Sequence, residues 1–195
     1  MKQPKLFLSL AAALMMTACA GDYTPVETFT EADDPVALTA EQQAAWDNVS
    51  KTLNAGWGSA NLHYSRSTVP TTDNNTQRII AWRGERASAQ AVVWTAEGLN
   101  GVEAEIAPFK GEAGTLPAEI AEARFVRYTL ADVQNYKFKK GGPEVIAPDM
   151  LDSLSRFDVE ARTARPIWIS LQIPSDAAAG TYTTNVTVSH HGFGK

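Results

Sequence analysis

Short runs in which apolar and polar side chains alternate constrain the fold of this chain more than any other feature of its sequence. In the clearest run, Ile167, Ile169 and Leu171 alternate with Trp168 and with polar residues. Side chains of a β-strand point alternately to its two faces, so this pattern predicts a strand with one buried face. Comparable runs predict further strands at residues 78–82, 87–96, 102–106, 124–133 and 181–189.

Turn-forming residues separate these runs, and the combination predicts a mainly β chain. Six or seven short strands joined by Gly-rich and Pro-rich turns are typical of a β-sandwich, expected here over residues 38–195. The stretch 135–163 is polar and contains proline, so we expect an excursion from the sandwich, with a turn of helix near residues 149–154. The expected turns are residues 97–98, 100–101, 111–114, 141–143 and 174–180.

One short helix is expected before the strands, over residues 39–53. Thr39 and Gln42 have the spacing of a capping box, which marks a helix N-terminus. Three apolar residues then recur at helical spacing, and two glycines end the pattern. They are Trp46, Val49 and Leu53, followed by Gly56 and Gly58.

Residues 1–18 have the pattern of a bacterial lipoprotein signal peptide. Lys2 and Lys5 precede an apolar run over residues 6–16. This run is shorter than the roughly 20 apolar residues that a membrane-spanning helix needs. The segment ends in Met-Thr-Ala before Cys19, which resembles a lipobox. We therefore expect the signal to be removed and Cys19 to carry a lipid anchor such as palmitate.

Residues 19–37 are acidic and rich in Thr and Pro, which predicts a flexible tether. Ala20, rather than aspartate, follows Cys19, so we expect a cell-envelope lipoprotein in the outer membrane of a Gram-negative bacterium. The lipid is expected to be its sole membrane contact. Cys19 is the one cysteine in the chain, which excludes an intramolecular disulfide.

Charge and histidine spacing argue against several classes of partner. Loss of the two lysines of the signal peptide changes the net charge from −5 to −7. An acidic chain without basic clusters is a poor candidate for binding nucleic acid. His63, His190 and His191 lack the spacing of a zinc site, and no loop has regular calcium ligands. No metal or other cofactor is expected.

Phrases spread over about residues 40–190 resemble, in content and order, the N-terminal domain of glycoside hydrolase family 123 proteins, which are related to β-N-acetylgalactosaminidases. No single phrase is diagnostic, but the ordered set is fairly specific. The phrases are residues 60–66, 82–86, 98–102, 124–128, 148–152, 162–168, 173–177 and 180–182.

The resemblance implies a β-sandwich that precedes a catalytic (β/α)8 barrel. In the family that barrel carries an adjacent Asp–Glu pair, whereas this sequence contains no Asp-Glu dipeptide. No catalytic residues can therefore be carried over to this chain. The sequence is interpreted as the non-catalytic accessory domain of a glycan-degrading lipoprotein, from a truncated or split gene. The missing barrel would be its partner, contacting the excursion at 135–163, including Met150.

A free-standing glycan-binding module of the cell surface is the alternative function, and a structural or remnant domain without a ligand is a third. For glycan contact, tryptophans could stack on sugar rings, and Arg and Glu could bind hydroxyl groups, although core packing and strand-end ion pairs are the plainer roles. Trp57, flanked by two glycines, is expected to be the most exposed tryptophan. The candidate contacts are Trp57, Arg83, Glu85, Arg86 and Trp168.

Overall fold

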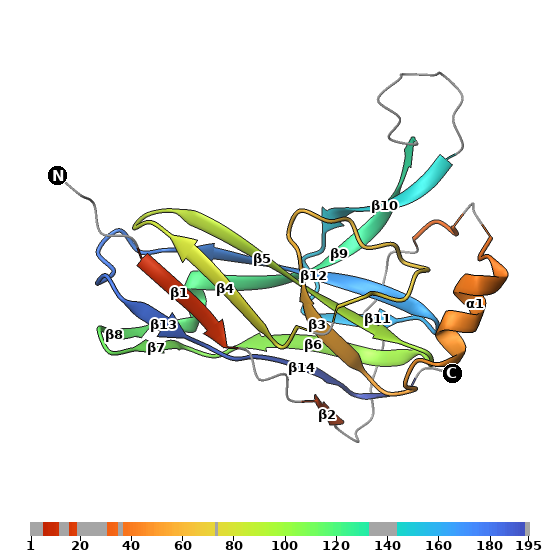
Figure 1. Cartoon of the computed structure of the whole chain (residues 1–195), viewed down its shortest axis with the longest axis horizontal. Coiled ribbons are helices and arrows are strands. Elements are labelled where there is room, and N and C mark those ends of the chain that lie inside the picture. Colours follow the sequence, from red (N-terminus) through yellow and green to blue (C-terminus); the bar gives the residue numbers. More distant parts are fainter. Residues whose placement is uncertain are drawn as a thin grey trace.

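The structure is a computed structural model that describes residues 6–11, 16–18, 31–34, 37–72, 74–132 and 144–193. Three sheets form an elongated β-sandwich, with a helix at one end (Figure 1). One sheet makes the first layer and will be called the main sheet. Its order is β10 (Glu144–Leu151), β9 (Ala121–Asp132), β12 (Thr163–Gln172), β5 (Arg86–Thr95) and β3 (Asn54–Gly58).

Two further sheets pack against one face of the main sheet and share its core. The first has the order β4 (Thr76–Ala81), β1 (Leu6–Ala11), β13 (Thr181–Thr183), β7 (Phe109–Gly111) and β8 (Gly114–Leu116). The second has the order β11 (Arg156–Val159), β6 (Leu99–Ile106), β14 (Val186–His190) and β2 (Met16–Ala18), with β15 (Gly192–Phe193) also paired to β6. The mainly β sandwich predicted from the sequence is confirmed.

The core lies between these layers and follows the alternation in the sequence. Ala89 and Ala91 of β5 and Ile167 and Ile169 of β12 all face it and are buried. These residues pair directly across the two central strands, so their side chains share one face. Phe125 of β9 extends the same face and pairs with Ile167. Residues between these positions therefore point away from the core.

The helix α1 (Ala40–Asp47) begins with the predicted capping box. The Thr39 hydroxyl accepts a hydrogen bond from the Gln42 backbone N–H, and the Gln42 side chain accepts one from the Thr39 N–H. Trp46 is buried, and its indole N–H donates to the Ser67 carbonyl at 2.8 Å. The helix is shorter than predicted and ends at Asp47 with Asn48 as its C-cap.

Several local predictions were wrong. Gly56 and Gly58 do not terminate a helix but lie in β3, where pairing with β5 holds them extended. Residues 149–154 were expected to be helical, but β10 runs through Leu151. Pro148 is tolerated there because β10 is an edge strand. Gly101, expected in a turn, lies in β6 with φ 59°, where the pairing with β11 is irregular.

The predicted signal peptide includes two short strands. β1 lies between β4 and β13, and β2 pairs with β14. Cys19 and the rest of the predicted tether before Glu31 lie outside the described residues. Among the residues that are described, no helix is long and apolar enough to span a bilayer.

Candidate functional site

The outward side of the main sheet is only partly covered by other segments. Residues 59–66 cover one end, where the Gln90 side chain donates to the carbonyls of Ser59 and Leu62 at 2.8 and 3.0 Å. Beyond Gln90, the outward residues of three strands form what we call the open face. Its members are Arg86 and Ser88 of β5, Trp168, Ser170 and Gln172 of β12, and Glu122 and Arg124 of β9.

The strand register fixes which of these side chains are neighbours. Trp168, which is half-buried, pairs with Arg124 on one side. Ser170 pairs with both Ser88 and Glu122. Side chains paired in this way lie about 5 Å apart at their Cβ atoms. The open face is therefore an indole bordered by hydroxyl, guanidinium and carboxylate groups.

A shallow hollow of about 270 Å³ lies on this face, and its lining includes Arg86, Glu119, Glu122, Ser170 and Gln172. Glu122 forms an ion pair with Arg124 at 2.7 Å, and both side chains are about half exposed. Such an exposed pair contributes little to stability. Its groups can exchange partners with a ligand at small cost.

The turn between β4 and β5 borders the same end of the main sheet. The Glu85 carboxylate accepts a hydrogen bond from the Trp82 backbone N–H at 2.6 Å, which orders the turn. Gly84 adopts φ 75° and donates its N–H to the Ile173 carbonyl at 3.0 Å. The Gln172 side chain in turn donates to the Gly84 carbonyl at 3.2 Å.

The structure thus gathers four of the five predicted glycan contacts near the open face. Arg86 and Trp168 belong to it, while Arg83 and Glu85 lie in the bordering turn. Trp57 does not join them. It is 3% exposed within the core, so the expectation that it is the most exposed tryptophan was wrong. Gly56 and Gly58 leave room for Thr72 and Tyr64 rather than exposing the indole.

The most exposed tryptophan is instead Trp82, whose residue surface is 43% exposed. Sequence reasoning assigned tryptophans next to apolar strands mainly to the core. The residues before Trp82 are apolar, so the sequence did not show which of them are buried. In the structure β4 buries alternate residues, Ile79 and Ala81, and ends at Ala81. Trp82 is one residue beyond Ala81 and therefore lies at an outward position.

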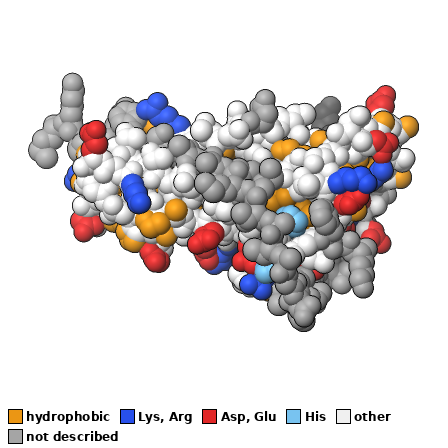
Figure 2. Space-filling view, turned by 90° about the horizontal axis from the view of Figure 1, so that it is seen from below, with side chains coloured by type: hydrophobic (Ala, Val, Ile, Leu, Met, Phe, Trp, Pro, Cys, Tyr) orange, Lys and Arg blue, Asp and Glu red, His pale blue; other side chains and the backbone are white. Residues whose placement is uncertain are grey.

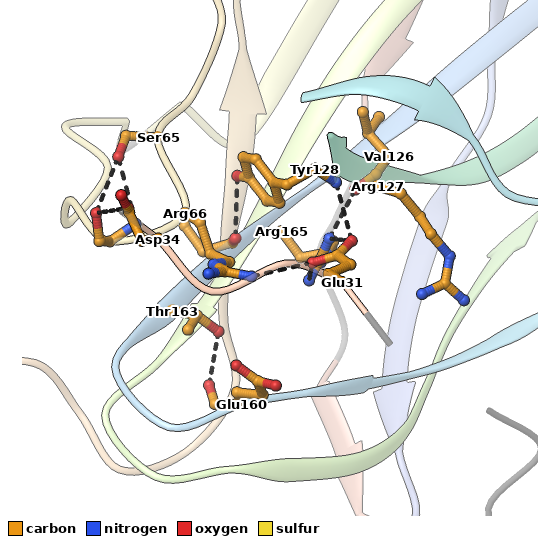
Figure 3. Close-up of polar contacts among 12 residues, drawn as sticks. Glu31, Asp34, Ser65, Arg66, Val126, Arg127, Tyr128, Glu160, Thr163 and Arg165 are labelled. Carbon is orange, nitrogen blue, oxygen red and sulfur yellow. Dashed lines mark hydrogen bonds and ion pairs between the residues drawn. The ribbon is translucent and has the colours of Figure 1, made fainter. Parts of the chain in front are cut away.

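A second polar cluster lies where two strands of the main sheet separate (Figure 3). We call it the clasp, and its members are Glu31, Arg66, Tyr128 and Arg165. Hydrogen bonding between β9 and β12 ends at the pair Phe125–Ile167, where the strands diverge. The Arg165 guanidinium lies in this gap and donates to the Val126 carbonyl at 3.0 Å. Glu31, from the segment before α1, accepts hydrogen bonds from Arg165 at 2.6 and 2.9 Å.

The Glu31 carboxylate has two further partners. The Tyr128 backbone N–H donates to it at 2.9 Å, and Arg66 forms an ion pair with it at 3.4 Å. Burial alone would raise the pKa of Glu31, but the hydrogen bonds and charge of Arg165, with Tyr128 and Arg66, outweigh burial and hold the pKa below its ordinary value. Glu31 is therefore a buried carboxylate ion whose charge is compensated.

Aromatic rings enclose the guanidinium groups of this region. Arg165 lies 4.3 Å from the centroid of the Phe157 ring and 4.9 Å from that of Tyr128. The Arg127 guanidinium also lies over the Phe157 ring, 4.8 Å from its centroid. It forms a buried ion pair with Asp152. Burial raises the pKa of the Tyr128 hydroxyl, which donates to the Tyr64 carbonyl at 2.8 Å. The clasp is thus a paired, enclosed network suited to holding segments together.

Two carboxylates that line another hollow also have partners. A hollow of about 450 Å³ is lined in part by Glu97, Asp158 and Glu160. Glu97 pairs with Lys51 at 2.7 Å, and Asp158 accepts from the Gly101 N–H at 2.8 Å. Within the described ranges, no group of three or more His, Cys, Asp or Glu residues is arranged to hold a metal ion.

Charged side chains of both signs are interspersed over the face of the molecule seen in Figure 2, and its described part has no continuous basic patch. A nucleic-acid-binding surface concentrates Lys and Arg. This face does not have that character.

Comparisons with known proteins agree with this architecture. The family model described as glycoside hydrolase 123 N-terminal domain matches residues 57–190. A solved structure of a family 123 glycoside hydrolase from Clostridium perfringens, described in relation to glycolipid glycan hydrolysis, superposes with a TM-score of 0.59 at 20% sequence identity. The match covers 72% of this chain and 27% of that one, and at this identity it shows the shared fold. No curated protein matches the chain.

Proposed function

Because this chain belongs to the family of glycoside hydrolase 123 N-terminal domains, we propose that it is a non-catalytic accessory domain of a glycan-degrading lipoprotein. In this proposal, a catalytic barrel outside residues 1–195 performs the hydrolysis, and this sandwich packs against it. The small share of the Clostridium perfringens enzyme that the chain matches, 27%, supports a division of labour between domains.

One surface supports docking of such a barrel. The ends of β9 and β10 project from the sandwich as a two-stranded ribbon (Figure 1). Leu130, Met150 and Leu151 of this ribbon are 54%, 39% and 41% exposed. The register shift between Pro148 and Met150 puts Met150 on the opposite side from Leu130 and Leu151. Apolar side chains on both sides of a projecting ribbon suit insertion against a partner domain.

The test combines the chain with a purified family 123 catalytic domain from the same organism. We expect the chain alone to release no chromophore from a chromogenic N-acetylgalactosaminide. We expect it to co-elute with the catalytic domain as a complex during size-exclusion chromatography. The double variant Leu130→Ser, Met150→Ser should lose the complex, because it removes apolar surface on both sides of the ribbon.

The matched control is Leu62→Ser, which removes a leucine of 57% exposure from another part of the surface. It should leave the complex intact. Hydrolysis by the chain alone, abolished by substitution of one of its own carboxylates, would contradict a non-catalytic role.

We further propose attachment to the outer membrane through a lipid on Cys19. The lipobox-like sequence before Cys19 supports this assignment. A clickable palmitate analogue should label the chain in growing cells, and Cys19→Ala should abolish the label. Equal labelling of both forms would exclude lipidation at Cys19.

A further inference from the structure

We infer that the open face of the main sheet is a binding site for a neutral oligosaccharide. The inference takes from the proposed function only the expectation that a glycan is nearby. It assigns ligand binding to a surface separate from the β9–β10 ribbon. Its parts are a half-buried indole, an exposed ion pair and a shallow polar hollow on three adjacent strands.

Trp168 provides the stacking surface. A pyranose ring has one face of C–H groups, and such a face packs favourably on an indole because it buries apolar area against it. Trp168 lies in the part of β12 that pairs with β5 on one side and with β9 on the other, so its backbone is held in place. A platform fixed in this way loses little side-chain entropy when a ligand binds.

The groups around Trp168 match the hydroxyl groups at the edge of a sugar. Arg124 pairs with Trp168 across the strands, and Glu122 pairs with Ser170 one step farther along the same face. One same-face step along a strand is about 6.8 Å, close to the width of one sugar ring. A ring stacked on Trp168 thus brings its neighbour over the hollow that Ser170 and Arg86 line.

The charges of the face favour a neutral ligand. Arg86 and Arg124 are balanced by Glu119 and Glu122, of which Glu122 is already paired with Arg124. Because the two charges of each sign cancel, the face offers no net attraction to an anionic sugar, whereas a neutral sugar can donate to the carboxylates and accept from the guanidinium groups. The hollow is also shallow and open along the sheet, which suits a chain rather than a single enclosed sugar.

The test is a titration of the intact chain with each of three tetrasaccharides. Binding is measured by calorimetry and by changes in the NMR signals of the tryptophan indole N–H groups. Cellotetraose and chitotetraose are the neutral probes, and tetragalacturonate is the anionic one. At least one neutral probe should bind saturably and shift the Trp168 signal, which is identified by its loss in Trp168→Ala. Tetragalacturonate should bind at least ten-fold more weakly.

Two variants locate the site. Trp168→Ala should weaken binding at least ten-fold. Because Trp168 is half-buried, Arg124→Ala provides a second variant on the surface and should weaken binding several-fold. Arg156→Ala is its matched control, since Arg156 is similarly exposed, at 43% against 41%, and pairs with Glu103 at 2.6 Å on the opposite layer. It should bind like the unmodified chain.

The inference is overturned if neither neutral probe binds, if tetragalacturonate binds best, or if Arg156→Ala weakens binding as much as Arg124→Ala. It is also overturned if Trp168→Ala abolishes the complex with the catalytic domain while glycan binding persists, because the face would then be a protein interface. A failure of the docking experiment leaves this titration unaffected, so the two proposals fail separately.

Discussion

At the residue scale, the Glu31 carboxylate compensates the charges of Arg165 and Arg66, whose side chains are 3% and 10% exposed. Glu31→Gln keeps the shape but removes the negative charge. Loss of one partner from a buried ion pair costs about 3–5 kcal/mol, because the other charge is left uncompensated. We expect the free energy of unfolding, measured with urea at neutral pH, to fall by about this amount. Asp33→Asn, an exposed change in the same segment, should have no effect.

The same residue predicts a pH dependence. The pKa of Glu31 in the folded chain lies below its ordinary value of 4.5. The stability it contributes is therefore complete above the pKa of the unfolded chain and is lost as the pH falls through the lower, folded pKa. The urea stabilities of the unmodified chain and Glu31→Gln should converge in that acidic range. A difference in urea stability that stays constant as the pH falls through that range would contradict the assignment.

The clasp also shows what the sequence could not supply. Glu31 was assigned to a flexible tether because its neighbours are acidic, Thr-rich and Pro-rich. Its partners Arg165 and Tyr128 are 134 and 97 residues away. No local pattern reports such distant pairing. Arg86 and Trp168 could be selected as candidates by residue type, but only the β5–β12 register places them on one face.

At the element scale, β7 pairs with β13 in the same sheet and approaches it closely at Gly111. A Cβ atom at Gly111 would lie 2.2 Å from the Thr181 carbonyl oxygen, a backbone atom that cannot move aside alone. Gly111→Ala should therefore destabilise the chain by about 3 kcal/mol, as overpacking does. Thermal unfolding followed by circular dichroism measures the change. Gly192→Ala is the control, since a Cβ there meets no atom within 4 Å, and an equal loss in both variants would exclude the proposed clash.

Strands in which apolar and polar residues alternate could be predicted from the sequence. Strands that form only because a neighbouring strand pairs with them could not. β5, β9 and β12 bury regular apolar positions, and their patterns were visible in the sequence. β3 contains two glycines and β10 contains Pro148, which are poor strand residues in isolation. Pairing with β5 and β9 supplies the hydrogen bonds that make them strands.

At the scale of the whole molecule, protection should fall from the centre of the main sheet toward its projecting ribbon. β5 and β12 pair along ten residues and lie over the core, whereas β10 is an edge strand with half-buried and exposed residues. Hydrogen exchange measured by mass spectrometry should be slowest in β5 and β12 and clearly faster in β10. Equal protection of β10 in a monomeric sample would show that the ribbon is as stable as the centre of the sheet without a partner, and would argue against the docking surface.

The clasp also sets how far the domain can stand from a membrane. In the lipid-anchored protein that we propose, Glu31 is the point at which the clasp fixes the chain to the sandwich, and it follows Cys19 by twelve positions. At about 3.3–3.6 Å per residue, twelve residues reach at most about 40 Å. The domain would be confined to a thin layer just above the lipid headgroups. Glycans that enter this layer would meet it at a high local concentration, while those held farther out would remain beyond its reach.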